Sequence, residues 1–177
     1  MRFPAIAVLV LMFGCSSPPG AANAPVAAPT VDTLQISEIS YELNVNWGVK
    51  DTDKITFHSN GSAEYFARLG YALVGFNRDP NRRGKFQGLI ETKDFDQLST
   101  LIVRRNFFSL KDKYVARGVA DAETITTAVR YSAGLKTVSN YGGGGDTEVG
   151  EIERAIISLA KQINWQRVDK VYCPLKS

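Results

Sequence analysis

Apolar and polar residues alternate along several segments of this 177-residue chain. From Ile39 to Trp47 every second residue is apolar, and Ser, Glu or Asn stands between the apolar positions. A period of two predicts a β-strand with one buried face. The alternation recurs from Thr124 to Tyr131, and Ala133-Gly134 predicts a turn into a partner strand from Leu135 to Tyr141.

The dipeptide Asn60-Gly61 separates two further β-rich runs within Lys54–Leu69. Both central residues of a type I′ turn need positive φ, which Asn and Gly adopt readily, so the dipeptide predicts a β-hairpin with this turn. Gly84–Ile90 is a short strand candidate farther along the chain. Together these segments predict about five to six strands.

Two other segments have apolar residues at helical spacing. In the first, Thr92 can cap a helix that ends near residues 106–108, and the apolar residues of one face are Phe95, Leu98, Leu101 and Ile102. In the second, the charged residues Glu151, Glu153, Arg154 and Lys161 are expected on other faces than the apolar residues, which are Ile152, Ala155, Ile156, Leu159, Ala160 and Ile163. We therefore expect two amphipathic helices.

These elements follow one another as strand, hairpin, strand, helix, hairpin and helix. Two helices are too few to cover both faces of a parallel sheet. We predict an α+β fold, in which an antiparallel sheet of about five to six strands has two amphipathic helices packed on one face. One globular domain is expected at residues 34–165, with a C-terminal tail at residues 166–177.

The N-terminal segment has the pattern of an export signal. Arg2 precedes an apolar run from Phe3 to Phe13 that is broken only by Pro4. Because about 20 apolar residues are needed to cross the hydrocarbon core, this run is too short for a transmembrane helix. Its charge and length are typical of a signal peptide, which we place at residues 1–14.

The end of this signal, LMFGC at residues 11–15, resembles the bacterial lipobox. The resemblance implies that diacylglycerol is attached to the Cys15 thiol and that cleavage leaves Cys15 as the new N-terminus. Met12 and Phe13 depart from the usual residues at their positions. Ser16, rather than Asp, after the cysteine favours the outer membrane as the site of the anchor, with the protein facing the periplasm.

Other interpretations of this region stay open. Ala22-Asn23-Ala24 has the small-x-small form that an ordinary signal peptidase cuts, although Pro25 follows it. Cys15 could also be a free thiol or form a disulfide with Cys173. We expect a flexible Pro-, Ala- and Ser-rich tether at residues 15–33, which gives Cys15 no fixed geometry for pairing. Acylation of Cys15 would leave Cys173 as an odd cysteine.

Composition argues against several classes of function. The formal net charge of +3 is too small to indicate a nucleic-acid partner. One histidine, His58, and two cysteines are too few for the usual zinc sites, and no cofactor motif is present, so we expect neither a metal nor a cofactor. A lone histidine can act as a general base, but the sequence places no nucleophile or orienting carboxylate beside it. We therefore predict no catalytic residue and a structural or solvent-facing His58.

A glycine-rich segment, Gly142–Thr147, precedes the second helix and suggests a phosphate-binding loop. Neither of the glycine motifs for phosphate binding is met, because no Lys follows and Asp146 and Glu148 would repel phosphate. We therefore expect a flexible connection in which Asp146 or Thr147 caps the helix.

Residues 77–85, NRDPNRRGK, form a basic segment close to two aromatic residues. This segment predicts a surface that contacts anionic lipid headgroups, cell-wall polymer or a partner protein. Its members are Tyr71, Phe76, Arg78, Arg82, Arg83 and Lys85. The alternative is a solvated loop whose arginines pair with local acids such as Asp79.

Several different short motifs are spread over the expected globular region. They are Ile39-Ser40-Tyr41, Ile55–Tyr65, Gly84–Gly88, Phe95 with Leu98, Asn106–Leu110, Tyr114, Thr124–Val129 and Gly134–Tyr141. Together they resemble a bacterial family, the domain of unknown function 6438, often found in exported and lipid-anchored proteins. Members of that family commonly carry a C-F-G-x-C-P segment after the first strand, where this chain reads NVNWGVKD at residues 44–51. The family has no assigned activity, so the resemblance implies the fold and leaves the function open.

The sequence thus leads us to expect a lipid-anchored bacterial cell-envelope protein whose small α+β domain is a non-catalytic binding or interaction module. The lipid anchor makes the membrane a partner, and an envelope protein or cell-wall polymer is a further expected partner. The alternative is an envelope hydrolase that acts on cell-wall material through carboxylates or His58.

Overall fold

The computed structural model describes residues 34–45, 51–68, 83–143 and 148–169. Within them the strands form one eight-stranded sheet in the order β5-β7-β6-β1-β2-β3-β4-β8. All neighbouring strands are antiparallel except β5, which runs parallel to β7. The strands are β1 (Glu38–Val45), β2 (Asp51–His58), β3 (Ser62–Ala67), β4 (Gly84–Leu89), β5 (Lys113–Val115), β6 (Thr124–Tyr131), β7 (Gly134–Tyr141) and β8 (Gln166–Arg167).

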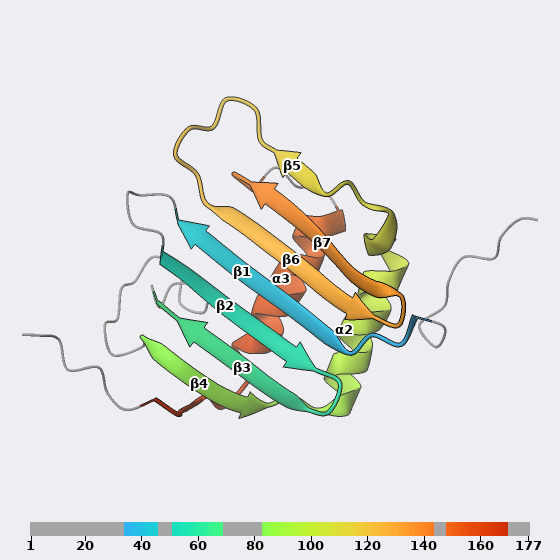
Figure 1. Ribbon diagram of the computed structural model, residues 1–177, viewed down its shortest axis with the longest axis vertical. Coiled ribbons are helices and arrows are strands. Elements are labelled where there is room, and N and C mark those ends of the chain that lie inside the picture. Colours follow the sequence, from blue (N-terminus) through green and yellow to red (C-terminus); the bar gives the residue numbers. More distant parts are fainter. Residues whose placement is uncertain (1–33, 46–50, 69–82, 144–147, 170–177) are drawn as a thin grey trace, which may run out of the picture.

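Two α-helices lie against the same face of this sheet (Figure 1). They are α2 (Thr92–Arg104) and α3 (Glu148–Ala160), and a 3₁₀ turn, η2 (Phe107–Ser109), follows α2. Phe95, Leu98 and Ile102 of α2 and Ile152 and Ile156 of α3 are buried in one core with the strands. The predicted α+β architecture is therefore confirmed.

The sheet is larger than the predicted sheet of five to six strands. The two additional strands are β5, with three residues, and β8, with two. Neither is long enough to show a period of two, so their presence depends on pairing with β7 and β4. β8 also lies beyond residue 165, where we placed the end of the globular region.

Strand register determines which side chains face the helices. Ile39 of β1 lies opposite Phe57 of β2 and Val129 of β6, and all three side chains are fully buried. Because successive residues of a strand point to opposite faces, Tyr41 shares this face with Ile39. The alternation predicted for β1 is therefore the alternation between the core and the opposite face of the sheet.

The hairpin between β2 and β3 forms where Asn60-Gly61 predicted it, but with a different turn. The amide of Gly61 donates to the carbonyl of His58 at 3.0 Å, and Gly61 has a φ of +86°. Asn60 does not have positive φ, which excludes the expected type I′ turn. The loop instead has three residues with glycine last. The Asn60 Oδ1 atom accepts from the amide of Ser62 at 3.0 Å and stabilises this loop.

Both helices were predicted, with small differences at their ends. Glu91, rather than Thr92, is the N-cap residue of α2, and it makes no side-chain capping hydrogen bond. The helix ends at Arg104, before the expected residues 106–108, because Asn106 adopts the left-handed conformation at a φ of +51°. In the described part of the chain no helix has the length and apolar character needed to cross a membrane.

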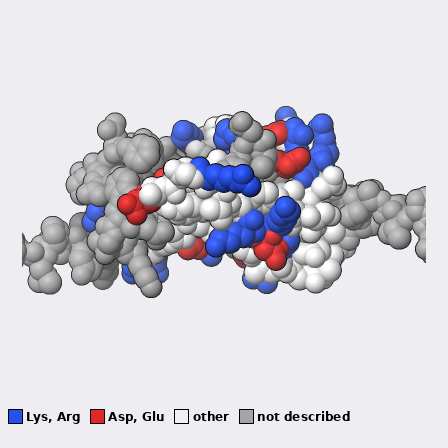
Figure 2. All heavy atoms as spheres, turned by 90° about the horizontal axis from the view of Figure 1, so that it is seen from above, with Lys and Arg blue, Asp and Glu red and all other residues white. Residues whose placement is uncertain are grey.

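The charged side chains do not gather into a single-sign surface where the molecule is viewed from above, toward the β5 edge. Figure 2 shows Lys and Arg side chains interspersed with Asp and Glu side chains over this side. This distribution agrees with the small formal net charge of +3 for the whole chain.

Candidate functional site

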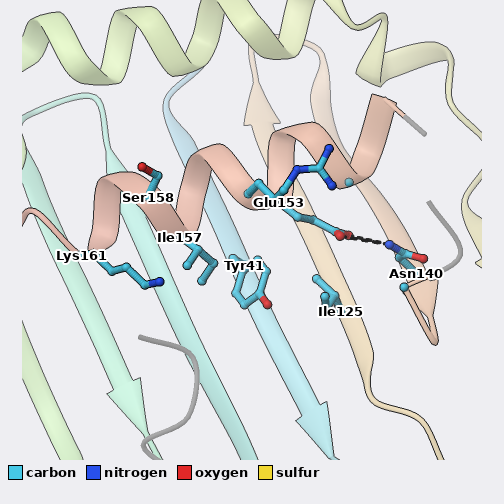
Figure 3. Close-up of a pocket in the computed structure, with 10 residues that line it drawn as sticks. Tyr41, Ile125, Asn140, Glu153, Ile157, Ser158 and Lys161 are labelled. Atoms are coloured by element: carbon cyan, nitrogen blue, oxygen red, sulfur yellow. Dashed lines mark hydrogen bonds between the residues drawn. The ribbon is translucent and has the colours of Figure 1, made fainter. Parts of the chain in front are cut away.

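A pocket of about 400 Å³ lies between α3 and the strands β1, β6 and β7 (Figure 3). This volume is within the range of small-molecule sites. The pocket is lined by Tyr41, Ile125, Asn140, Gly143, Gly150, Glu153, Arg154, Ile157, Ser158 and Lys161. It therefore combines apolar walls with several charged and polar side chains.

Three neighbouring strands supply the floor of the pocket. Ile125 of β6 lies opposite Leu43 of β1 and Asn140 of β7, so these three side chains point to the same face. Tyr41 is two residues before Leu43 and shares this face. Val138, the preceding inward residue of β7, is fully buried in the hydrophobic core. Asn140 is thus a polar residue at a position that would otherwise extend the core.

Helix α3 supplies the opposite wall. Glu153, Ile157 and Lys161 are spaced four residues apart, so they form one stripe along the helix. The exposed residues Arg154 and Ser158 form a second stripe at the outer margin of the pocket. The pocket accordingly has a buried acidic residue inside and cationic side chains at its rim.

Glu153 and Asn140 form a buried hydrogen-bonded pair at one end of the pocket. The Asn140 Nδ2 donates to Glu153 Oε2 at 3.0 Å and to Oε1 at 3.3 Å, and the two residues are 6% and 1% exposed. Desolvation by burial raises the pKa of the Glu153 carboxyl to about 7, while the Asn140 hydrogen bond and the charge of Arg154 oppose this rise. The carboxyl is therefore close to half protonated at neutral pH.

Several polar groups of the pocket have no partner among the described residues. The buried Asn140 Oδ1 accepts no hydrogen bond. Arg154 and Lys161 form no ion pair with a described side chain, although both line the pocket. Because an unpartnered buried acceptor costs free energy, the Asn140 oxygen indicates a position where a donor from a ligand or water would be stabilising.

Tyr41 contributes a neutral hydroxyl to the pocket. Burial raises its phenol pKa above its ordinary value, and the negative charges of Glu153, Glu123 and Asp53 raise it further. The phenolate is thus strongly disfavoured, so Tyr41 can donate or accept a hydrogen bond but is a poor base. In Figure 3 the hydroxyl lies on the side of the ring toward Ile125.

The pocket holds no recognisable nucleophile and base pair among its described residues. Ser158 and Lys161 have S-x-x-K spacing, which in penicillin-binding enzymes marks a serine nucleophile. Here, however, the Ser158 hydroxyl points away from the Lys161 ammonium (Figure 3). Ser158 lies in the last turn of α3, and Lys161 directly follows the helix. No cluster of His, Cys, Asp and Glu among the described residues could hold a metal ion.

Comparison with known proteins assigns the chain to a family. The family model described as domain of unknown function (DUF6438) matches residues 38–160, which is more than half of the chain. The chain belongs to the DUF6438 family. No curated protein matches it. The match begins at the first residue of β1 and ends at the last residue of α3, so it contains the strands and the helix that build the pocket.

The single histidine of this DUF6438 protein lies outside the pocket. His58 pairs in register with Glu38, and both lie next to the inward-facing Ile39 and Phe57. Their side chains therefore point to the face of the sheet opposite α3, with 3.9 Å between His58 Nδ1 and Glu38 Oε2. The sheet separates His58 from Glu153, so the two residues cannot act on the same substrate atom.

Only part of the predicted basic surface lies in the described residues. Tyr71, Phe76, Arg78 and Arg82 lie outside them, as do Cys15, Cys173, Asp146 and Thr147. Arg83 and Lys85 are exposed at the start of β4. Phe66 of β3 pairs in register with Lys85 on one side and with Lys54 of β2 on the other. The Arg68 guanidinium lies 5.8 Å from the centre of the Phe66 ring. Lys54, Lys85 and Arg68 are thus grouped around the Phe66 ring.

The sequence interpretation missed the principal residues of the pocket. Glu153 was placed away from the apolar face of its helix, whereas the structure buries it facing the sheet. The reason is that α3 packs against both the sheet and α2, so its buried face is wider than a single apolar stripe. Asn140 was detectable in principle, because it occupies an inward position in the alternation of β7.

Proposed function

We propose that this DUF6438 protein is a lipid-anchored protein of the bacterial cell envelope whose domain binds a small ligand without transforming it. The observation that supports binding is the pocket between α3 and the sheet, with its buried Glu153–Asn140 pair and an Asn140 oxygen to which no described residue donates. The lipobox at residues 11–15 supports the anchored state.

The composition of the pocket favours binding over catalysis. Glu153 is the only carboxylic acid among the described residues that line it. Glycosidases commonly need two carboxyl groups that flank the scissile bond, and serine hydrolases need a base within hydrogen-bond reach of the hydroxyl. Neither arrangement is present among the described lining residues. Hydrogen-bonding groups on apolar walls are instead typical of a site that fixes the orientation of a ligand.

One observation favours the alternative, an envelope hydrolase. A buried carboxyl with a pKa of about 7 is suited to general acid or base catalysis near neutral pH. An experiment must therefore distinguish a ligand that is released unchanged from a substrate that is converted.

We would incubate the purified domain with a small-molecule extract of bacterial envelopes and examine the complex by native mass spectrometry. The wild type should retain a compound of defined mass, and that compound should be recovered with unchanged mass. The Ile157→Trp variant, which fills the pocket, should lose the adduct, whereas the matched variant Leu135→Trp, at an exposed position on β7, should keep it. Time-dependent conversion of the compound by the wild type alone would favour the hydrolase. An adduct that Ile157→Trp also retains would contradict the assignment of the pocket.

Anchoring is tested separately with the full-length protein in a bacterial host. A Cys15→Ser variant should lose incorporation of a labelled fatty acid and leave the membrane fraction, because the serine hydroxyl cannot replace the thiol in lipidation. A Cys173→Ser variant serves as the control and should stay labelled and membrane-bound. Labelling of Cys15→Ser at the level of the wild type would contradict the lipobox interpretation.

A further inference from the structure

The polar groups of the α3 pocket have a fixed spatial order. Glu153 and Asn140 are inside, where hydrogen-bond acceptors predominate. Among the described residues, only Asn140 donates to the Glu153 oxygens, and none donates to the Asn140 Oδ1. Lys161 and Arg154 are exposed at the rim and form no ion pair with a described side chain. A complementary ligand thus carries hydrogen-bond donors at its inner end and a negative charge at its outer end.

We infer that the pocket binds a short peptide with free termini, with its ammonium group at Glu153 and Asn140 and its carboxylate at Lys161 on the rim. This inference rests on the proposed binding function and specifies the class of ligand. An ammonium group supplies up to three donors, and Glu153 and the Asn140 Oδ1 are acceptors available to it. A carboxylate is the natural counterpart of an unpaired lysine or arginine.

The dimensions of the pocket agree with a ligand of a few residues. Glu153 and Lys161 are eight residues apart, which corresponds to about 12 Å along a helix axis. An extended peptide spans about 3.3–3.6 Å per residue, so a tripeptide is comparable with this length. Ile125 and Ile157 provide apolar walls for small side chains between the two charged ends. Figure 3 shows the Lys161 side chain extending from the end of α3 toward Tyr41.

Trialanine and two blocked derivatives test this inference. N-acetyl-trialanine lacks the ammonium group, and trialanine amide lacks the carboxylate, while both keep the same chain. We would titrate each into the ¹⁵N-labelled protein and follow the amide signals of α3, β6 and β7 by NMR. Trialanine should bind about tenfold or more tightly than either derivative, because each derivative loses one charge-assisted contact.

Two substitutions connect each terminus with its expected partner. Glu153→Gln should weaken trialanine but leave N-acetyl-trialanine unchanged, because the acetylated peptide has no ammonium to lose. Lys161→Gln should weaken trialanine but leave trialanine amide unchanged. Lys111→Gln, at an exposed position outside the pocket, is the matched control and should have no effect.

Equal affinity for trialanine and both derivatives would overturn the inference, as would signal changes confined to residues outside the pocket. The outcome is separable from that of the proposed function. Suppose that the wild type retains an envelope compound and Ile157→Trp does not, while neither trialanine nor its two derivatives bind the wild type. The pocket is then a binding site, but its ligand is not a peptide.

Discussion

Replacing Glu153 by Gln should remove part of the pH dependence of stability. The free energy of unfolding of the variant should gain on that of the wild type as the pH rises from low values to pH 8. The native carboxyl has a pKa of about 7, compared with 4.5 for an ordinary glutamate, because it is buried. The native state therefore binds this proton more tightly than the unfolded state does. The stabilisation that the proton provides is complete below pH 4.5 and is lost as the pH rises through 7.

The magnitude follows from the two pKa values. Their difference corresponds to about 3 kcal/mol of unfolding free energy, which the wild type loses between pH 4.5 and about pH 8. Glutamine has nearly the same shape, stays neutral and still accepts a hydrogen bond from the Asn140 Nδ2. The variant should thus lack this part of the pH dependence.

Urea denaturation at half-unit steps from pH 4.5 to 8 measures the effect. The free energy of unfolding of Glu153→Gln minus that of the wild type should rise by about 3 kcal/mol across this range. The control Glu148→Gln makes the same substitution at an exposed position of the same helix, and a rise of the same size in this control would contradict the assignment of the effect to Glu153. A Glu153→Gln difference that varies by less than about 1 kcal/mol would refute the argument that burial controls this carboxyl.

Two further predictions concern β4. Gly88→Ala should lower the free energy of unfolding by about 1–3 kcal/mol in urea denaturation, because a Cβ atom there would collide with the Ile163 Cγ2 atom. Unchanged stability would contradict this packing. The double substitution of Arg83 and Lys85 by Glu should weaken binding of the protein to phosphatidylglycerol vesicles in a sedimentation assay. The melting temperature should not fall, since both side chains are exposed. Unaltered vesicle binding would argue against a basic contact surface.

The sequence was sufficient to predict those elements in which the periodicity of apolar residues continues over a whole strand or helix. β1, β6 and α3 each contain enough residues to show their period, and the structure contains each of them. β5 and β8 depend on neighbours that are distant along the chain, because Lys113 pairs with Ser139 and Arg167 pairs with Phe86. No local pattern in two or three residues could have predicted those pairings.

The pocket was less predictable than the fold for a different physical reason. Its residues come from three strands and one helix, so their proximity depends on register and on the position of α3 above the sheet. The inward position of Asn140 follows from the alternation of β7, but the inward position of Glu153 does not follow from an apolar stripe. Searches for histidine, cysteine and glycine motifs could not detect a pair that consists of an amide and a carboxyl.

The energetic cost of Glu153 is itself an argument that the pocket has a function. An apolar residue at this position would extend the core that Ile152 and Ile156 already form, and it would avoid the desolvation of a carboxyl. The Asn140 Oδ1 adds a second cost, because it is buried and no described residue donates to it. Neither cost improves the packing of the sheet against α3. Local departures from the rules of stable packing are concentrated at functional sites, and here two of them meet in one pocket. The cations at its rim form no ion pair with a described side chain. Ligand binding would reduce both costs, since a donor at this position would satisfy the amide oxygen and an ammonium would favour the charged carboxylate.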